Sequence, residues 1–233
     1  YAALSELNDP ETKILTAEDP VEYDIDGLCQ AQIRTEVGMT FGKALRSFLR
    51  QDPDVILVGE VRDLETAQIS VQAALTGHLV FTTLHTNDAP SSIARLLDLG
   101  LEPFLVTATL EAIVAQRLVR RICTNCKTEF QPSEEMLMEL ALTPEDVGDR
   151  PFYYGRGCDY CNGTGYRGRQ GLYEIMVMDD HLRELVQRHA SSALLRQEAV
   201  KRGMRTLREA GLAAIYDGST TIEEVVKETI FDE

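Results

Sequence analysis

Short apolar runs alternate with amphipathic segments over the first half of the chain. The runs Ile14–Ala17, Val55–Val58 and Leu79–Leu84 contain many β-branched residues and end in polar groups. Such runs predict buried parallel strands. Between them, Phe41–Leu49 and Leu64–Leu75 have apolar residues at helical spacing and predict two helices. The order strand, helix, strand, helix, strand predicts an α/β fold with a wound sheet.

The pattern changes after the first part of the chain. Residues 123 to about 178 are rich in Gly and Tyr, which predicts a loop-rich region with one helix near Glu134–Leu140. Further along, amphipathic segments predict a helical tail in which Ser191 and Thr221 act as N-caps. The helices are expected at residues 181–189, 191–202, 205–217 and 221–230. We therefore expect three regions, at residues 1–120, 121–178 and 179–233.

Composition and charge exclude several classes of protein. Of 233 residues, 44% are hydrophobic and 26% are charged, which is typical of a globular protein and excludes a disordered or collagen-like chain. No apolar window approaches the roughly 18 residues that a membrane-spanning helix needs. With 38 acidic and 23 basic residues, the net charge is −15, so a role in coating nucleic acid is not expected. The chain starts at Tyr1 with no charged leader, and we expect it to begin inside a longer protein.

Four of the five cysteines form two C-x2-C pairs. Cys123 with Cys126 and Cys158 with Cys161 offer four thiolates, the ligand set of a structural zinc site, with 31 residues between the pairs. Four protein ligands close the coordination sphere, so such a zinc would be structural. A redox dithiol or a disulfide framework is the alternative, although redox pairs normally occur once, near a βαβ unit. Cys29 stands alone and is interpreted as an ordinary residue.

Acidic residues follow two of the predicted strands, and a histidine follows the third. Glu60 comes two residues after Val58, Glu18 and Asp19 follow the first strand, and His85 follows the last. Because the carboxyl ends of neighbouring parallel strands meet at one edge of a sheet, we expect these side chains to lie close together. A carboxylate at this edge can polarise the water that attacks a γ-phosphate. The alternative for Glu60 is a carboxylate favoured by the dipole of the following helix.

Histidines and arginines near these strands are candidates for phosphate contacts. His78 and His85 bracket the third strand, and an imidazole near a phosphate can respond to the nucleotide, although a lone histidine is more often structural. Arg46 and Arg50 are four residues apart, on one face of a predicted helix. Guanidinium groups suit phosphate, and ion pairs with neighbours such as Asp52 are the alternative.

Four long motifs, in order, closely resemble those of the ATPases that drive type II secretion and type IV pilus assembly. They are TAEDPVEY (Thr16–Tyr23), LRQDPDVILVGEVRDLETA (Leu49–Ala67), TGHLVFTTLHTNDA (Thr76–Ala89) and AQRLVRRICTNC (Ala115–Cys126). The segment GCDYCNGTGYRGRQGLYEI (Gly157–Ile175) is similar to the second cysteine segment of the same family. The resemblance covers almost the whole chain.

The resemblance implies a fold and a set of site residues. The expected fold is a RecA-like P-loop ATPase core, truncated in this chain, with a four-cysteine zinc-binding insert and a C-terminal helical region. Glu60 matches the Walker B glutamate that polarises the hydrolytic water, and Glu18 matches the acidic position of the Asp box. His85 matches the His-box residue near the γ-phosphate, and His78 belongs to the same box. The arginines that match positions at the nucleotide or the subunit interface are Arg46, Arg50, Arg95 and Arg120. The expected cofactors are ATP, Mg²⁺ and Zn²⁺.

One motif of the family, the Walker A loop, is not found in these residues. The segment Gly38–Ala44 (GMTFGKA) has three residues between its glycines instead of four, and ends in Ala where Mg²⁺ needs a hydroxyl. We expect the loop to precede Tyr1 in a longer protein. Because this loop supplies the backbone cradle, the lysine and the Mg²⁺ hydroxyl, we expect little or no ATP hydrolysis by these residues alone.

The resemblance also implies a machine and a location. We expect a cytoplasmic homo-hexamer that powers assembly of a type II secretion pseudopilus or a type IV pilus through an inner-membrane platform protein, without inserting into the membrane itself. The four cysteines favour secretion or pilus extension over retraction, and the sequence does not choose between those two. A non-catalytic, zinc-stabilised assembly or regulatory module of the same machine is the alternative. A DNA-translocating ATPase is disfavoured by the net charge of −15.

Overall fold

The computed structural model describes residues 1–229, and the chain divides into two compact units. Unit 1 consists of Tyr1–Glu111 and Met178–Arg196. Unit 2 consists of Ala112–Val177 and the described residues from Gln197 onward. The three regions expected from the sequence follow changes in composition, whereas these units follow contacts between residues.

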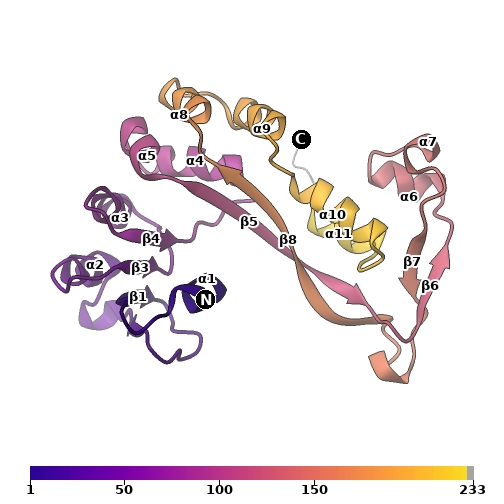
Figure 1. The fold of residues 1–233 in the computed structure, drawn as a ribbon, viewed down its shortest axis with the longest axis horizontal. Helices are drawn as coiled ribbons and strands as arrows, with labels where there is room; N and C mark the ends of the chain where they lie inside the picture. Colours follow the sequence, from indigo (N-terminus) through magenta and orange to yellow (C-terminus); the bar gives the residue numbers. More distant parts are fainter. Residues whose placement is uncertain (230–233) are drawn as a thin grey trace. The chain divides into compact units, whose positions relative to one another are not determined.

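Unit 1 is built on a parallel sheet with the order β2-β1-β3-β4 among the described strands (Figure 1). The strands are β1 (Ile14–Glu18), β2 (Cys29–Gln32), β3 (Val55–Val58) and β4 (Leu79–Thr82). All residues of β1 are buried, as are all of β3 except one. These two strands are central and apolar because helices cover parallel sheets on both faces. The predicted α/β fold with a parallel sheet is confirmed.

The helices of unit 1 are α1 (Ala2–Leu7), α2 (Phe41–Phe48), α3 (Leu64–Leu75), α4 (Ala89–Asp98), α5 (Pro103–Thr109) and α8 (Asp180–Gln187), with a 3-10 turn η1 (Thr35–Val37). Among these helices, α2 and α3 lie beside the sheet, and α8 lies beside α5 (Figure 1). The two helices predicted between the strands are α2 and α3. Helix α3 begins directly after the loop that follows β3, because the carboxylate of Asp63 accepts a hydrogen bond from Thr66 N at 2.8 Å and caps its first turn.

Strand register decides which side chains reach the carboxyl edge of the sheet. Ala17 pairs with Val58, and Val58 pairs with Thr82, so the three strands end in line. The residues that follow them therefore emerge at the same edge, as expected from the sequence. This is the edge on which the candidate site is built.

Unit 2 contains a long antiparallel pair of strands and a short hairpin. Strand β5 (Ala112–Ile122) pairs with β8 (Tyr166–Val177), and β6 (Lys127–Phe130) pairs with β7 (Phe152–Gly155). The prediction of mainly loops in this part of the chain is wrong for residues 166–177. Glycines in that stretch suggested turns, but partners on β5 satisfy its backbone groups over most of its length.

Short helices complete unit 2. They are α6 (Glu134–Glu139), α7 (Pro144–Val147), α10 (Leu207–Tyr216) and α11 (Ile222–Glu228), with a 3-10 turn η2 (Asp159–Cys161), while α9 (Ser192–Lys201) begins in unit 1 and continues in unit 2. The predicted helical C-terminal region is confirmed, and Thr221 caps α11 as expected. The last predicted position, residue 230, lies outside the described residues. Within residues 1–229, every helix is too short or too polar to span a bilayer.

Candidate functional site

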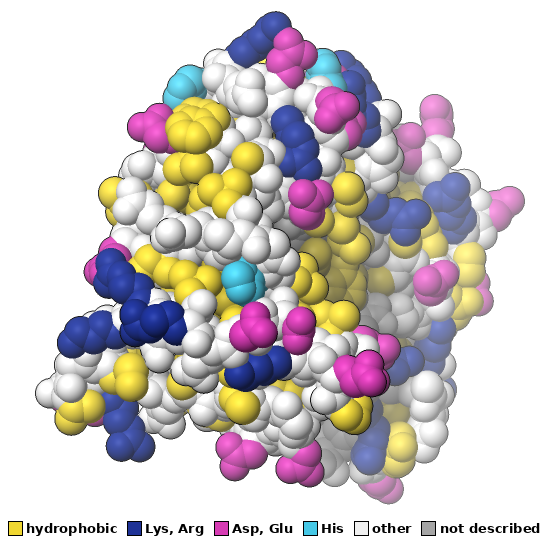
Figure 2. Space-filling view, turned by 60° about the vertical axis from the view of Figure 1, so that its left-hand side comes forward, with side chains coloured by type: hydrophobic (Ala, Val, Ile, Leu, Met, Phe, Trp, Pro, Cys, Tyr) yellow, Lys and Arg dark blue, Asp and Glu magenta, His cyan; other side chains and the backbone are white. Residues whose placement is uncertain are grey.

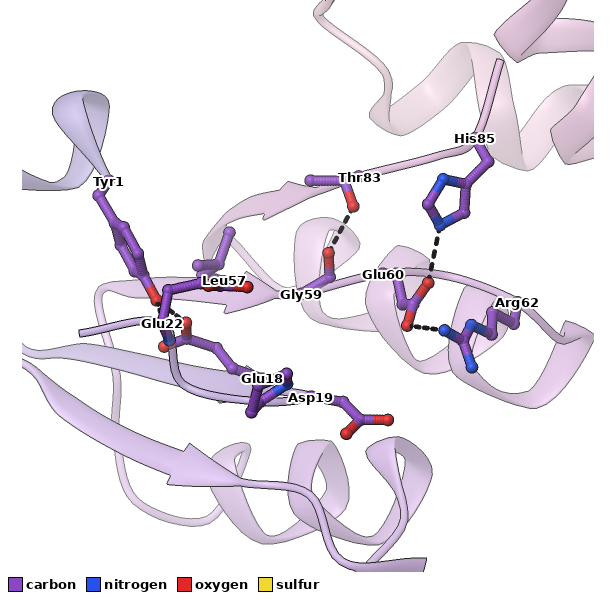
Figure 3. Close-up of a pocket in the computed structure, with 11 residues that line it drawn as sticks. Tyr1, Glu18, Asp19, Glu22, Leu57, Gly59, Glu60, Arg62, Thr83 and His85 are labelled. Carbon is purple, nitrogen blue, oxygen red and sulfur yellow. Dashed lines mark hydrogen bonds and ion pairs between the residues drawn. The ribbon is translucent and has the colours of Figure 1, made fainter. Parts of the chain in front are cut away.

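A pocket of about 430 Å³ lies at the carboxyl edge of the unit 1 sheet (Figure 3). Its lining comes from the segments that follow β1, β3 and β4 and from the start of the chain. The lining residues are Tyr1, Glu18, Asp19, Pro20, Glu22, Leu57, Gly59, Glu60, Arg62, Thr83 and His85. Three residues singled out from the sequence, Glu18, Glu60 and His85, are thus brought into one pocket.

Glu60 lies near the centre of this arrangement and is only 8% exposed. One carboxylate oxygen, Oε2, is 3.0 Å from His85 Nε2, and the other, Oε1, is 2.5 Å from a guanidinium nitrogen of Arg62 (Figure 3). Both partner side chains are largely exposed, at 83% for His85 and 66% for Arg62. Each oxygen of the buried carboxylate thus has one partner, the Arg62 guanidinium or the His85 imidazole, and both partners lie on the solvent side.

The surroundings of Glu60 keep it ionised. Burial by itself raises the pKa of the carboxyl. The hydrogen bonds from His85 and Arg62, together with the charge of Arg62, lower the pKa by more than burial raises it, so it lies below its usual value. A carboxylate that is ionised at neutral pH can accept a hydrogen bond from a water molecule. This is the state that general-base chemistry requires.

Gly59 allows β3 to approach β1 closely at the edge of the pocket. Its N–H donates to the carbonyl oxygen of Ala17 at 2.7 Å. A Cβ at position 59 would lie 3.0 Å from that carbonyl oxygen and 3.2 Å from Glu18 Cα. Any larger side chain would therefore push against the β1 backbone.

Neutral donors hold the carboxylate of Glu18, which is 4% exposed. The hydroxyl of Tyr1 donates to Oε2, while Thr16 Oγ1 and Gln30 Nε2 donate to Oε1 at 2.5 and 3.0 Å. The Tyr1 hydroxyl also accepts a hydrogen bond from Glu22 N at 3.2 Å. Glu18 thus forms an anchored acidic wall of the pocket.

His78 is separated from the pocket, although the sequence motif contains both histidines. It precedes β4, at the opposite end of that strand from His85, and is partly buried. Its Nδ1 lies 2.9 Å from Ala73 O and 3.0 Å from Thr76 Oγ1. These contacts link His78 to the C-terminal turn of α3, and its expected role near the nucleotide stays a prediction.

Three predicted arginines of unit 1 are absent from the pocket lining among the described residues. Arg46 on α2 lies 2.5 Å from Glu65 on α3, and both side chains are more than half exposed. Arg50 lies in the turn after α2, and Arg95 lies on α4; both are exposed. Their expected roles at the nucleotide or at a subunit interface stay predictions.

Arg120 belongs to unit 2 and is engaged within it. Its guanidinium lies 2.6 Å from Glu224 Oε1 and 4.0 Å from the centre of the Tyr166 ring, and its backbone N–H donates to Glu224 Oε2 at 2.8 Å. Hydrogen bonding to Glu224 raises the pKa of Arg120. The residue ties β5 to α11, and its expected role at a nucleotide stays a prediction.

Several lining residues were missed by the sequence reasoning. Arg62 follows Glu60 by two residues, so its proximity to a candidate carboxylate was a usable signal. Thr83, whose hydroxyl donates to Gly59 O, lies just beyond the end of β4. Tyr1 reaches Glu18 from an element far away in sequence, as does Gln30, which is not itself a lining residue, and no local pattern indicates such contacts.

In unit 2 the four paired cysteines form one cluster. Their Sγ atoms all lie within 4.8 Å of one another, and the separations are 3.9 Å for Cys123–Cys158, 3.8 Å for Cys126–Cys161 and 3.7 Å for Cys158–Cys161. A disulfide needs sulfurs about 2.05 Å apart, so these distances do not describe one. Four thiolates about 2.3 Å from a central zinc in a tetrahedron lie about 3.8 Å apart. The cluster therefore fits a tetrahedral zinc.

Backbone donors favour the thiolate form of Cys161 in this cluster. The N–H groups of Cys158 and Gly165 point at Cys161 Sγ from 3.2 and 3.3 Å. Burial raises the pKa of the Cys161 thiol, but these hydrogen bonds outweigh it and lower the pKa to about 6. Gly155 has no side chain at the base of the cluster, where a Cβ would lie 2.0 Å from Gly165 O, and the two backbones can therefore touch.

Comparison with known proteins gives consistent matches over almost the full chain. Residues 1–227 match the family model described as type II/IV secretion system protein. The type IV pilus assembly ATPase PilB of Myxococcus xanthus is 53% identical over 100% of this chain and 41% of its own length. The type II secretion system protein HxcR of Pseudomonas aeruginosa is 50% identical over 98% of this chain and 45% of its own. The chain thus spans less than half the length of these curated relatives.

Solved structures show the same fold. A crystal structure of the pilus retraction motor PilT with bound ADP is 27% identical and matches with a TM-score of 0.68, over 98% of this chain and 56% of that one. The ATPase DotB of Legionella pneumophila, 20% identical, matches with a TM-score of 0.62 over 91% of this chain and 50% of its own. The second match concerns the fold alone.

Proposed function

Because the chain belongs to the type II/IV secretion system protein family, we propose that it is the part of a motor ATPase that carries the water-activating carboxylate. The observation that supports this most directly is the pocket in which Glu60, Glu18 and His85 meet at the carboxyl edge of a parallel sheet. The relatives of this chain include proteins named as type IV pilus assembly ATPases. The proposed reaction is hydrolysis of ATP.

In this proposal Glu60 polarises the attacking water. Its carboxylate is ionised and nearly buried, and His85 holds one of its oxygens. His85 and Arg62 are the cationic or potentially cationic groups of the pocket lining, so they are suited to contact phosphate oxygens. Mg²⁺ bound with ATP would neutralise phosphate charge. Glu18 is a second carboxylate of the same pocket lining, and its neutral hydrogen-bond donors hold it in place.

The test uses a hybrid, because the Walker A loop is not among these residues. These 233 residues replace the matching 41% of the Myxococcus xanthus relative, and steady-state ATP hydrolysis is measured. We expect an active hybrid in which Glu60→Gln lowers kcat by about 10²- to 10⁴-fold, the range of general-base catalysis. Glu102→Gln, at an exposed position outside the pocket lining, is the matched control and should leave the rate unchanged.

Two results would contradict the proposal. An inactive hybrid, beside an active parent relative, would show that these residues do not supply a working catalytic half. An active hybrid in which Glu60→Gln hydrolyses ATP as fast as the unchanged hybrid would exclude Glu60 as the base. The second result would favour the alternative function, a non-catalytic assembly or regulatory module.

We further propose that the four-cysteine cluster holds one structural Zn²⁺, and that the whole protein works as a cytoplasmic homo-hexamer docked on an inner-membrane platform protein. The zinc proposal rests on the spacing of the sulfurs. The proposals of a hexamer and of a platform partner rest on family membership. Sedimentation of the hybrid with and without nucleotide tests the hexamer.

Acidic and basic side chains are mixed on the face seen in Figure 2. With a net charge of −15, this surface supports a protein partner over nucleic acid.

A further inference from the structure

Arg62 and His85 are already paired with Glu60, although a phosphate ligand would need the same two side chains. Each oxygen of Glu60 has its own partner, at 2.5 Å for Arg62 and 3.0 Å for His85. The other residues of the lining with ionisable side chains are Tyr1, Glu18, Asp19 and Glu22, and none of these side chains is cationic. A polyphosphate that enters this acidic pocket therefore competes with Glu60 for the side chains of Arg62 and His85.

Differences in exposure decide which group moves. The side chain of Glu60 is 10% exposed and that of Arg62 is 66% exposed. Glu60 also follows Gly59, whose backbone is hydrogen-bonded to β1, so reorienting Glu60 would disturb packed structure. Reorienting Arg62 changes little packing, since its guanidinium is in solvent. An ion pair with such an exposed partner contributes little, and a phosphate can replace the carboxylate as its partner.

We propose that Arg62 is a phosphate-responsive positioning residue: it holds Glu60 while the pocket lacks phosphate, and turns to the phosphate chain when a nucleoside triphosphate binds. This step exchanges one ion pair for another and breaks no covalent bond. It frees Oε1 of Glu60 to accept a hydrogen bond from water. The inference rests on the proposed function of the same pocket and adds its regulation by the ligand.

The first test uses the 233-residue chain and follows the Glu60 carboxyl carbon by NMR through a pH titration. Arg62→Gln should raise the pKa of Glu60, because it removes a hydrogen bond and a positive charge. Arg62→Lys should restore part of the difference. The control is Arg188→Gln, which removes an arginine of similar exposure, 72% against 66% for Arg62, from its ion pair with Glu184 at the C-terminal end of α8 and should leave Glu60 unchanged.

The second arm adds inorganic triphosphate as the probe. If Arg62 leaves Glu60 for phosphate, triphosphate raises the pKa of Glu60 more in the unchanged chain than in Arg62→Gln, where there is no ion pair to lose. An equal rise in both proteins would overturn the proposal, because it would reflect only the negative charge of the probe. A Glu60 signal that does not respond to triphosphate at any concentration would also overturn it.

Activity of the hybrid separates this inference from the proposed function. Arg62→Gln should lower kcat/KM by about tenfold to a hundredfold, which corresponds to one charge-assisted hydrogen bond, and should move the acid limb of the pH profile to higher pH. An inactive hybrid together with the expected NMR response would refute the proposed function and leave the exchange intact. An active hybrid with an unshifted acid limb in Arg62→Gln would refute the exchange alone.

Discussion

Replacing Glu224 should destabilise unit 2 more than an ordinary surface substitution would. The residue is 2% exposed and lies in the first turn of α11. Its two carboxylate oxygens accept hydrogen bonds from the backbone N–H of Arg120 at 2.8 Å and from the Arg120 guanidinium at 2.6 Å. One buried side chain therefore fixes a helix to the long strand β5, near the C-terminal end of that strand.

The two hydrogen bonds contribute differently to the free energy of unfolding. Glu224→Ala leaves the Arg120 N–H without its acceptor, and a buried unpaired donor costs about 1–3 kcal/mol. The guanidinium side chain is 47% exposed, so losing its ion pair adds less than about 1 kcal/mol because water replaces the carboxylate. We therefore expect Glu224→Ala to lower the free energy of unfolding by about 1–4 kcal/mol. Glu224→Gln keeps one acceptor oxygen and should cost about half as much.

Urea denaturation followed by tyrosine fluorescence measures this loss. The chain has no Trp, and six of its eight tyrosines lie in unit 2. Arg120→Ala keeps its backbone N–H, so a double-mutant cycle with Glu224→Ala isolates the side-chain ion pair. The coupling free energy should be at most about 1 kcal/mol, and the larger remainder belongs to the backbone hydrogen bond. A coupling as large as the whole effect of Glu224→Ala would refute this reasoning.

The same pair predicts a dependence of stability on pH. Burial raises the pKa of Glu224, but the hydrogen bonds and charge of Arg120 outweigh it, so the pKa in the folded protein lies below its ordinary value. The stabilisation is therefore complete above the unfolded pKa of about 4.3 and is lost as the pH falls through the lower folded value. The difference in stability between the unchanged chain and Glu224→Gln should shrink in that acidic range. A difference that grows on acidification would show that the sign is wrong.

Three further outcomes are expected. Purified under reducing conditions, the chain should contain about one zinc per molecule by elemental analysis, and Cys161→Ser should reduce that content; a metal-free protein under chelator-free conditions would contradict the zinc site. Gly211→Ala should destabilise unit 2 by about 1–3 kcal/mol, because the new Cβ would lie 2.4 Å from Val225 Cγ1; unchanged urea stability would show that α10 and α11 can separate without cost. Asp63→Ala should cost about 1 kcal/mol by removing the N-cap of α3, whereas Asp63→Asn should be nearly neutral.

The centre of unit 1 could be predicted because its two central strands, β1 and β3, are buried on both faces. The runs that became β1 and β3 are continuous and apolar, and parallel pairing places their ends in line. That geometry brought Glu18, Glu60 and His85 into one pocket, as expected. Strand β2 was missed, since it is short, contains two glutamines and has no buried residue. It lies at the edge of the sheet, where one strand partner suffices.

The long pair in unit 2 was missed for a different reason. On β8, Leu172, Glu174 and Met176 are buried while Tyr173, Ile175 and Val177 are exposed. Burial alternates, but hydrophobicity does not, because a glutamate lies inside and apolar residues lie outside. The partner strand is also far away in sequence, with Ala112 opposite Val177. Periodicity cannot predict a strand whose inner and outer faces are equally apolar.

Site residues that act through side chains of distant elements were hardest to predict. Motif spacing placed His78 with His85, but a strand separates them and only the second reaches the pocket. In the sequence Tyr1 was noted only as the first residue. Its hydroxyl reaches Glu18 because α1, which follows it, packs beside β1 and β3 through Leu4, Ile14 and Val55. Such contacts depend on tertiary packing, which local patterns do not encode.

The four-cysteine cluster has a consequence for the unfolded chain as well as for the folded one. A metal held by both pairs ties Cys126 to Cys158 across 31 intervening residues. A cross-link of that span lowers the conformational entropy of the denatured chain and so raises its free energy by about 3–4 kcal/mol, as a disulfide would. Unlike a disulfide, this cross-link forms under reducing conditions. It also fixes only the two ends of the β6–β7 excursion, so that excursion can gain or lose residues at its tip during evolution while its anchor stays the same.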